Sequence, residues 1–276
     1  MKSGSWRVGV VVATVAFGLA LGCAPTDRPE SSEPATGAES ADWTPTPLPD
    51  GDTEPPDAGT VVRRAAEFIQ SQPEFLTEAM VTFGALQESG QTLHFDVLER
   101  VAIRRPDKLA WVTLNDDGTV DRGWLSAGQF TLLKQPINMW GTISVPSAIP
   151  EAVDRLIEEY DLDVPFQDFL SPETAERWAG EDATSLEYIG EEWVLGSWTD
   201  HVAMRKPGID FELWVRQGPE PFPAKMMVVY TEDEGRPTYV ARFRRWSTTL
   251  PEGDATFEFT APGDAQRVDV TPVIRP

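Results

Sequence analysis

Apolar and polar residues alternate along the first half of the chain after residue 60, which is typical of antiparallel strands with one buried face. The clearest case is Thr92–Arg104, where one face is apolar except for Glu99. Clusters of Gly, Asn, Asp and Pro separate the apolar runs and predict tight turns between them. The strands predicted here are Phe75–Leu86, Thr92–Arg104, Leu109–Leu114, Gly123–Ser126, Phe130–Lys134 and Asn138–Val145.

A second run of strands is predicted between Trp193 and Trp246. Its segments are rich in Trp, Phe, Val and Tyr, which fit a pleated, half-buried surface, and Gly- and Pro-containing turns separate them. Neighbouring strands should therefore pair antiparallel as a meander. The predicted strands are Trp193–Arg205, Phe211–Arg216, Ala224–Tyr230 and Thr238–Trp246, followed by a last strand, Ala255–Phe259, before a Pro-rich tail.

Helical spacing of apolar residues occurs before the first run of strands and between the two runs. Thr60–Gln70 has one apolar face, and a second apolar stripe follows Pro150, a residue suited to a first helical turn. A short helical piece, Gln167–Leu170, and a helix over Glu173–Ala179 with Ser171 as its N-cap complete the insertion. The pattern as a whole predicts an α+β fold.

The first 23 residues have the pattern of a signal peptide. Lys2 and Arg7 precede an apolar run from Val8 to Leu21, which is shorter than the ~20 residues needed to span a bilayer. The run ends at Cys23, the only cysteine of the chain, so the domain has no internal disulfide.

The segment Leu19-Ala20-Leu21-Gly22-Cys23 resembles the bacterial lipobox, although the lipobox prefers Leu where Ala20 stands. The resemblance implies that Cys23 is lipidated and becomes the mature N-terminus. The protein would then be anchored in the bacterial cell envelope, in the outer membrane of a diderm because Ala24 follows the cysteine, or on the outer side of the cytoplasmic membrane. The alternative is an ordinary cleaved signal that leaves Cys23 as an incidental thiol.

Residues 24–59 are predicted to form a disordered tether. Residues 24–57 contain nine acidic residues, one Arg and eight prolines, a composition too polar to repay the entropy of ordering. We expect an extended spacer that separates the membrane from a domain comprising residues 60–276.

The charge of the chain excludes one class of partner. Acidic residues outnumber basic residues by 45 to 23, which gives a net charge of −22. Nucleic-acid binding requires clustered Lys and Arg, so we expect no nucleic-acid partner.

Candidate catalytic and metal-binding groups are few. The histidines are His94 and His201, and Asp200-His201 near Ser197 lacks the spacing of a nucleophile elbow. Neighbouring residues of one strand point to opposite faces, so Asp200 and His201 should not act together. Asn115–Gly118 lacks the ligand spacing of a calcium loop. We therefore expect a protein that is not an enzyme and has neither a metal site nor a cofactor.

Six short segments resemble the LolA/LolB-like superfamily of bacterial envelope proteins, and most closely an uncharacterised family of predicted periplasmic proteins within it. The resemblance covers about residues 61–268. It implies a curved, unclosed antiparallel half-barrel with helices plugging its concave side. In characterised members of the superfamily, the cavity of this half-barrel holds acyl chains. The segments are Arg104–Leu109, Ala152–Leu156, Asp200–Ala203 with Lys206–Gly208, Phe211–Val215 and Pro223–Lys225.

Strand alternation then selects residues for the inner face of that half-barrel. We expect some of them to line an apolar cleft and most to pack against the helices. The candidate lining residues are Phe95, Val97, Trp111, Trp140, Phe211, Leu213, Met226, Val228 and Phe243.

These patterns favour a lipid-anchored, non-enzymatic envelope protein that binds or transfers a lipid or other hydrophobic ligand. A second hypothesis is an envelope protein-interaction or sensor module with a filled core, whose protein partner the sequence does not specify. A third, a hydrolase, would need His94 or His201 beside a nucleophile in a cleft.

Overall fold

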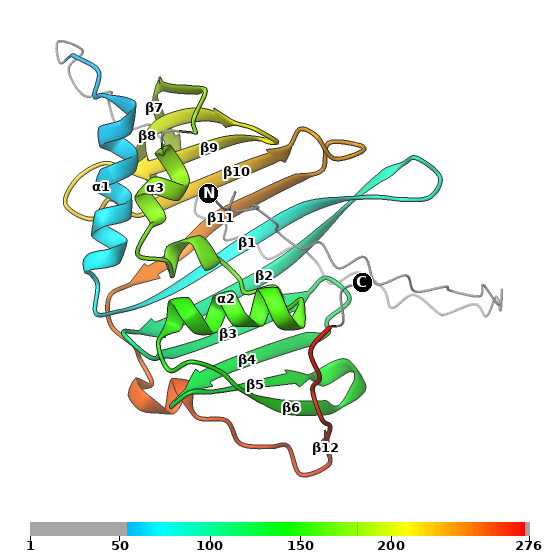
Figure 1. Cartoon of the computed structure of the whole chain (residues 1–276). Coiled ribbons are helices and arrows are strands. Elements are labelled where there is room, and N and C mark those ends of the chain that lie inside the picture. Colours follow the sequence, from blue (N-terminus) through cyan, green and yellow to red (C-terminus); the bar gives the residue numbers. More distant parts are fainter. Residues whose placement is uncertain (1–53, 181, 274–276) are drawn as a thin grey trace, which may run out of the picture. The chain divides into compact units, whose positions relative to one another are not determined.

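Twelve strands form one sheet in the computed structural model, which describes residues 54–180 and 182–273 (Figure 1). The strand order is β12-β6-β5-β4-β3-β2-β1-β11-β10-β9-β8-β7, so β12 and β7 are the two edges and the sheet stays unclosed. All pairs of neighbouring strands are antiparallel except β12 with β6, which is parallel. The predicted signal peptide, Cys23 and the tether up to residue 53 lie outside the described residues.

The two predicted runs of strands form the two halves of this sheet, joined by the pairing of β1 with β11. The first half contains β1 (Glu74–Leu86), β2 (Thr92–Arg104), β3 (Lys108–Asn115), β4 (Val120–Ser126), β5 (Gln129–Lys134) and β6 (Met139–Ser144). The second half contains β7 (Ser185–Val194), β8 (Ser197–Lys206), β9 (Ile209–Arg216), β10 (Pro223–Tyr230) and β11 (Thr238–Ser247). The edge strand β12 (Gln266–Arg267) comes from the C-terminal tail.

Three α-helices lie on the concave face of the curved sheet (Figure 1). They are α1 (Ala58–Ser71), α2 (Ile149–Tyr160) and α3 (Thr174–Ala179), with the 3₁₀ turns η1 (Gln135–Ile137), η2 (Gln167–Phe169) and η3 (Gly253–Phe257) between elements. The Asp57 carboxylate accepts a hydrogen bond from the backbone N–H of Thr60 at 2.8 Å and so caps α1. The expected α+β half-barrel with helices on its concave side is confirmed.

The predicted strand Trp193–Arg205 is wrong at its N-terminal end, because the chain reverses before β8 begins at Ser197. Leu195 and Gly196 have φ angles of 47° and 83°, and this turn separates β7 from β8. Trp193 and Trp198 face each other across the hairpin with ring centres 5.4 Å apart. The structure therefore has one more strand in the second half than the sequence predicted.

Two further predictions at helix and strand ends are wrong. The segment predicted as strand Ala255–Phe259 begins inside the 3₁₀ turn η3 and forms no strand, and Phe257 is buried on the convex face of the sheet. Ser171 is not the N-cap of α3; that position is Glu173, and the Ser171 hydroxyl accepts a hydrogen bond from the Glu173 N–H at 3.1 Å.

The Trp111 indole lies directly across Gly123 of the neighbouring strand. A Cβ atom at Gly123 would lie 2.4 Å from the Trp111 ring, whose other side stacks on Phe130 at 5.1 Å. Gly123→Ala should therefore lower the free energy of unfolding by about 1–3 kcal/mol through overpacking. Urea denaturation checks this, with Gly263→Ala as a control at a glycine without a positive φ and with no described atom within 4 Å of the added Cβ. Equal losses in both variants would contradict overpacking against Trp111.

Candidate functional site: the concave face of the half-barrel

The concave face of the sheet is a continuous apolar wall. Of the nine predicted lining residues, seven are buried in the main hydrophobic cluster that this wall forms with the helices. Phe95 lies on the same face of β2 as Val97 but is only partly buried, next to Phe83 at 5.8 Å. The seven buried residues are Val97, Trp111, Phe211, Leu213, Met226, Val228 and Phe243.

Trp140 lies on the opposite, convex face, so its prediction as a lining residue is wrong. Ile143 of the same strand belongs to the concave cluster, and residues three apart on a strand point to opposite faces. The Trp140 ring packs against Phe259 at 5.0 Å, and Phe259 packs in turn against Trp124.

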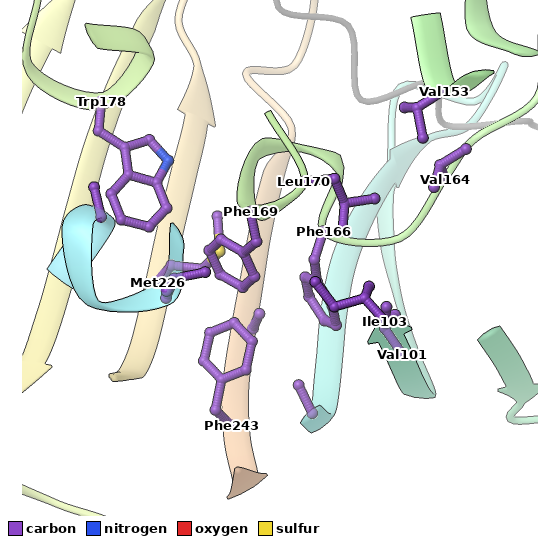
Figure 2. Packing of buried hydrophobic residues seen from close by; sticks show 14 of the residues in the cluster. Val101, Ile103, Val153, Val164, Phe166, Phe169, Leu170, Trp178, Met226 and Phe243 are labelled. Atoms are coloured by element: carbon purple, nitrogen blue, oxygen red, sulfur yellow. The ribbon is translucent and has the colours of Figure 1, made fainter. Parts of the chain in front are cut away.

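Aromatic side chains from the helical insertion fill the centre of the concave face. We call the buried residues Phe166, Phe169, Leu170 and Trp178 the aromatic plug. Figure 2 shows Phe169 facing Phe243 of the wall, with a distance of 5.5 Å between ring centres. Phe169 also meets Trp178 edge to face at 5.4 Å. The plug is therefore packed like an ordinary core.

Sequence reasoning identified the helices of the insertion but not the plug. Its signal was the spacing of Phe166, Phe169 and Leu170 around η2, which places apolar side chains on one side of a short turn. Nothing in that spacing shows where on the sheet they dock.

The loop that leads from α2 into the plug carries backbone strain at both ends. Asp161 and Phe166 both have φ of 54°, in the left-handed region. This conformation costs a non-glycine residue roughly 1–2 kcal/mol. We call residues 161–166 the plug loop, and such strain persists only where surrounding contacts hold it.

Polar contacts fasten the plug mainly at its two ends. The Gln70 amide of α1 donates to the carbonyl oxygens of Phe169 at 3.1 Å and Ser171 at 2.6 Å, and Arg105 also donates to the Phe169 oxygen at 3.3 Å. At the end of α3, the buried Lys206 ammonium donates to the Arg177 carbonyl at 2.7 Å. Side chains rather than strand pairing therefore fix the insertion.

Two acidic groups lie close to the plug. Burial raises the pKa of Asp168 in η2 to about 6, although Arg177, 3.6 Å away, lowers it. Burial also raises the pKa of Glu99 in β2 to about 8; the negative Asp163 of the plug loop adds to this effect, and a hydrogen bond from Tyr239 opposes it. At neutral pH the Glu99 carboxyl is therefore mostly protonated.

Two hollows on the domain surface lie away from the predicted lining residues. The larger, with a volume of about 580 Å³, is lined by residues of α1, among them Arg63, Arg64 and Phe68, and by the turn that contains Pro219. The smaller, about 340 Å³, lies beside Arg205 and Asp210. Neither hollow reaches the main hydrophobic cluster, in which side chains of the helices and the plug cover the wall.

The histidine and its acidic neighbour do not form a catalytic pair. Asp200 points to the helical side, where it accepts a hydrogen bond from Arg64 at 2.7 Å. His201 lies on the other face between the carboxylates of Glu192 and Glu212, at 2.8 and 2.9 Å, and stacks on Trp214. These contacts give both residues a structural role in the polar interactions of the sheet.

Among the described residues, no helix is long and apolar enough to cross a membrane.

Comparison with known proteins gives one family and several similar folds. The model of a family described as predicted periplasmic protein (DUF2092) matches residues 58–271. No curated protein matches the sequence.

Three solved structures illustrate the likeness in fold. An uncharacterised conserved protein from Thermus thermophilus has a TM-score of 0.44 at 13% identity, covering 77% of this chain and 98% of its own. The lipoprotein LppX of Mycobacterium tuberculosis has a TM-score of 0.41 at 11% identity, covering 70% and 96%. A LolA superfamily protein from Nitrosomonas europaea has a TM-score of 0.34 at 9% identity, covering 74% and 98%.

Proposed function

We propose a function for this chain, which belongs to the DUF2092 family of predicted periplasmic proteins: it binds an acyl chain or similar hydrophobic ligand on its concave face, in place of the aromatic plug. The observation that carries the proposal is that the wall belongs to the sheet, whereas the plug belongs to an insertion between its two halves. The insertion can therefore move without breaking a strand pair.

The free energy gained by burying the ligand and the free energy lost by exposing the plug are of similar size. Burial of one CH₂ contributes about 0.8 kcal/mol, so an acyl chain that buries ten of them contributes about 8 kcal/mol. Exposure of the four plug side chains costs roughly 1.5–3 kcal/mol for each. Relief of the strain at Asp161 and Phe166 offsets part of that cost. A chain of ordinary lipid length can thus compete with the plug.

The N-terminal region would confine this activity to one membrane surface. We propose that residues 1–23 are a lipoprotein signal, that Cys23 carries the lipid anchor, and that residues 24–59 form the tether. Helix α1 begins at Ala58, within the last two residues of that segment. The shielded ligand would be carried in the envelope, with no catalytic step.

Native mass spectrometry tests the proposal. Residues 24–276, purified from a bacterial host without detergent, should carry adducts with the masses of phospholipids or fatty acids. Phe243→Glu places a charge where the wall meets the plug, so this variant should lose the adducts if it keeps its circular dichroism spectrum. Glu88→Gln, at an exposed position of the β1–β2 hairpin, is the control. A clean apo mass that persists after incubation with phospholipid vesicles would contradict the proposal.

A protein-interaction module is the second candidate, and two observations favour it. The concave face is filled, and three large apolar side chains are exposed at the edge of the sheet: Ile189 (51% exposed), Trp193 (48%) and Leu195 (53%) in β7 and its hairpin. A strand edge with exposed apolar side chains is a site for a partner chain. The apo mass described above would favour this candidate.

A further inference from the structure

Glu99 is a buried acidic residue of the concave wall. It lies on the same face of β2 as Val97 and Val101, which belong to the main hydrophobic cluster, and only 9% of its surface is exposed. Its Oε2 atom is buried and has no hydrogen-bond partner among the described residues. Buried polar atoms are nearly always paired, so an unpaired carboxyl oxygen on an apolar wall points to a group that is bound there in another state.

The charges around Glu99 are negative. Asp163 of the plug loop raises the pKa of Glu99, and the hydroxyl of Tyr239 in β11 is its hydrogen-bonding neighbour. Burial raises the pKa of Tyr239 well above 10, and electrostatic repulsion from Glu99, from Tyr230 in β10 and from Asp168 in η2 adds to this effect. An anion would be repelled here, whereas a cation would pair with Glu99 and relieve its repulsion with Asp163.

Strand register places Glu99 close to the plug. Glu99 pairs with Ala79 of β1, and Ala79 pairs with Phe243 of β11, the wall residue on which Phe169 packs. Two strand spacings, roughly 10 Å, therefore separate the backbone of Glu99 from that of Phe243. A chain that replaces Phe169 would bring its polar end within reach of Glu99.

We propose that Glu99, supported by Tyr239, is the headgroup site of the half-barrel and that it binds a positively charged amino group at the end of a hydrophobic chain. This inference rests on the proposed function and specifies its ligand class. On binding, the neutral Glu99 carboxyl loses its proton to solvent and the resulting carboxylate pairs with the ammonium group. Binding of an amine therefore releases one proton.

Competition between three ligands of equal chain length tests the headgroup. The fluorescent probe N-phenyl-1-naphthylamine is bound to residues 24–276 at pH 7.5 and displaced by dodecylamine, dodecan-1-ol or dodecanoic acid, each below its micelle concentration. We expect dodecylamine to act at about a tenfold lower concentration than the alcohol, and dodecanoic acid to be the weakest. In Glu99→Gln the ratio of amine to alcohol should fall towards one, whereas in Glu88→Gln it should stay as in the wild type.

A pH series on the wild type gives a second measurement that needs no variant. Because Glu99 must ionise to pair with the amine, the advantage of dodecylamine over dodecan-1-ol should grow between pH 6.5 and 8 and then level off. Equal displacement by the three ligands at every pH would overturn the headgroup site and leave the proposed function standing. Failure of the probe and of all three ligands to bind would overturn both.

Discussion

Phe169→Ala should make the protein less stable and at the same time a better binder of hydrophobic chains. Phe169 is 1% exposed and contacts Phe243, Trp178, Phe166 and Trp246 through ring-to-ring distances of 5.4–5.7 Å. Its truncation should lower the free energy of unfolding by about 3–5 kcal/mol. If the plug competes with the ligand, the same loss also lowers the cost of displacing the plug, so the affinity for dodecan-1-ol should rise at least tenfold.

Phe257→Ala is the matched control for the predicted loss of stability and gain of affinity. Phe257 is 3% exposed and belongs to the cluster on the convex face, with Leu76 and Leu250. Its truncation should destabilise the protein by a similar amount but leave the affinity for the alcohol unchanged. Urea denaturation gives the stabilities, and displacement of N-phenyl-1-naphthylamine gives the affinities. A Phe169→Ala variant that loses stability without any increase in affinity would show that the plug is a fixed part of the core.

The sheet was predictable from the sequence wherever alternation and turn chemistry agreed. Thr92–Arg104 is bounded by a Gly-containing hairpin turn and by Pro106, and the structure gives the same bounds to β2. The β7–β8 hairpin was missed because its turn, Leu195-Gly196, is flanked by Trp193, Val194 and Trp198, which all favour strands. The turn depends on the left-handed conformation of Leu195, for which the residue type gives no signal.

The side of the sheet on which a strand residue lies was predictable only where one face of the strand is clearly polar. The alternation of Phe211 and Leu213 with Glu212 identifies the concave side of β9, and both apolar residues are buried there. In β6, Trp140 and Ile143 are both apolar but have opposite parity, so the sequence does not show which one points inward. The plug was missed for a related reason: its contacts with Phe243 span more than 70 residues and depend on the curvature of the sheet.

Glu99→Gln should make the protein more stable than the wild type as the pH rises. In the wild type, burial holds the pKa of Glu99 at about 8 in the folded state, against 4.5 for an exposed glutamate. At this residue the folded state therefore binds more protons than the unfolded chain between these values. The contribution of Glu99 to stability is fully present below pH 4.5 and is lost as the pH rises to about 8. Glutamine has the same shape and does not ionise, so it removes this loss.

The difference in unfolding free energy between Glu99→Gln and the wild type should grow by on the order of 4 kcal/mol between pH 5 and pH 8.5. Asp168 titrates near pH 6 in both proteins, so its contribution cancels in the difference. Urea denaturation at half-unit pH steps measures the effect, with Glu88→Gln as the exposed control that should show no pH-dependent difference. A constant difference across the whole range would mean that Glu99 stays ionised in the folded protein. The wall would then already contain a carboxylate before any amine binds, and amine binding would release no proton.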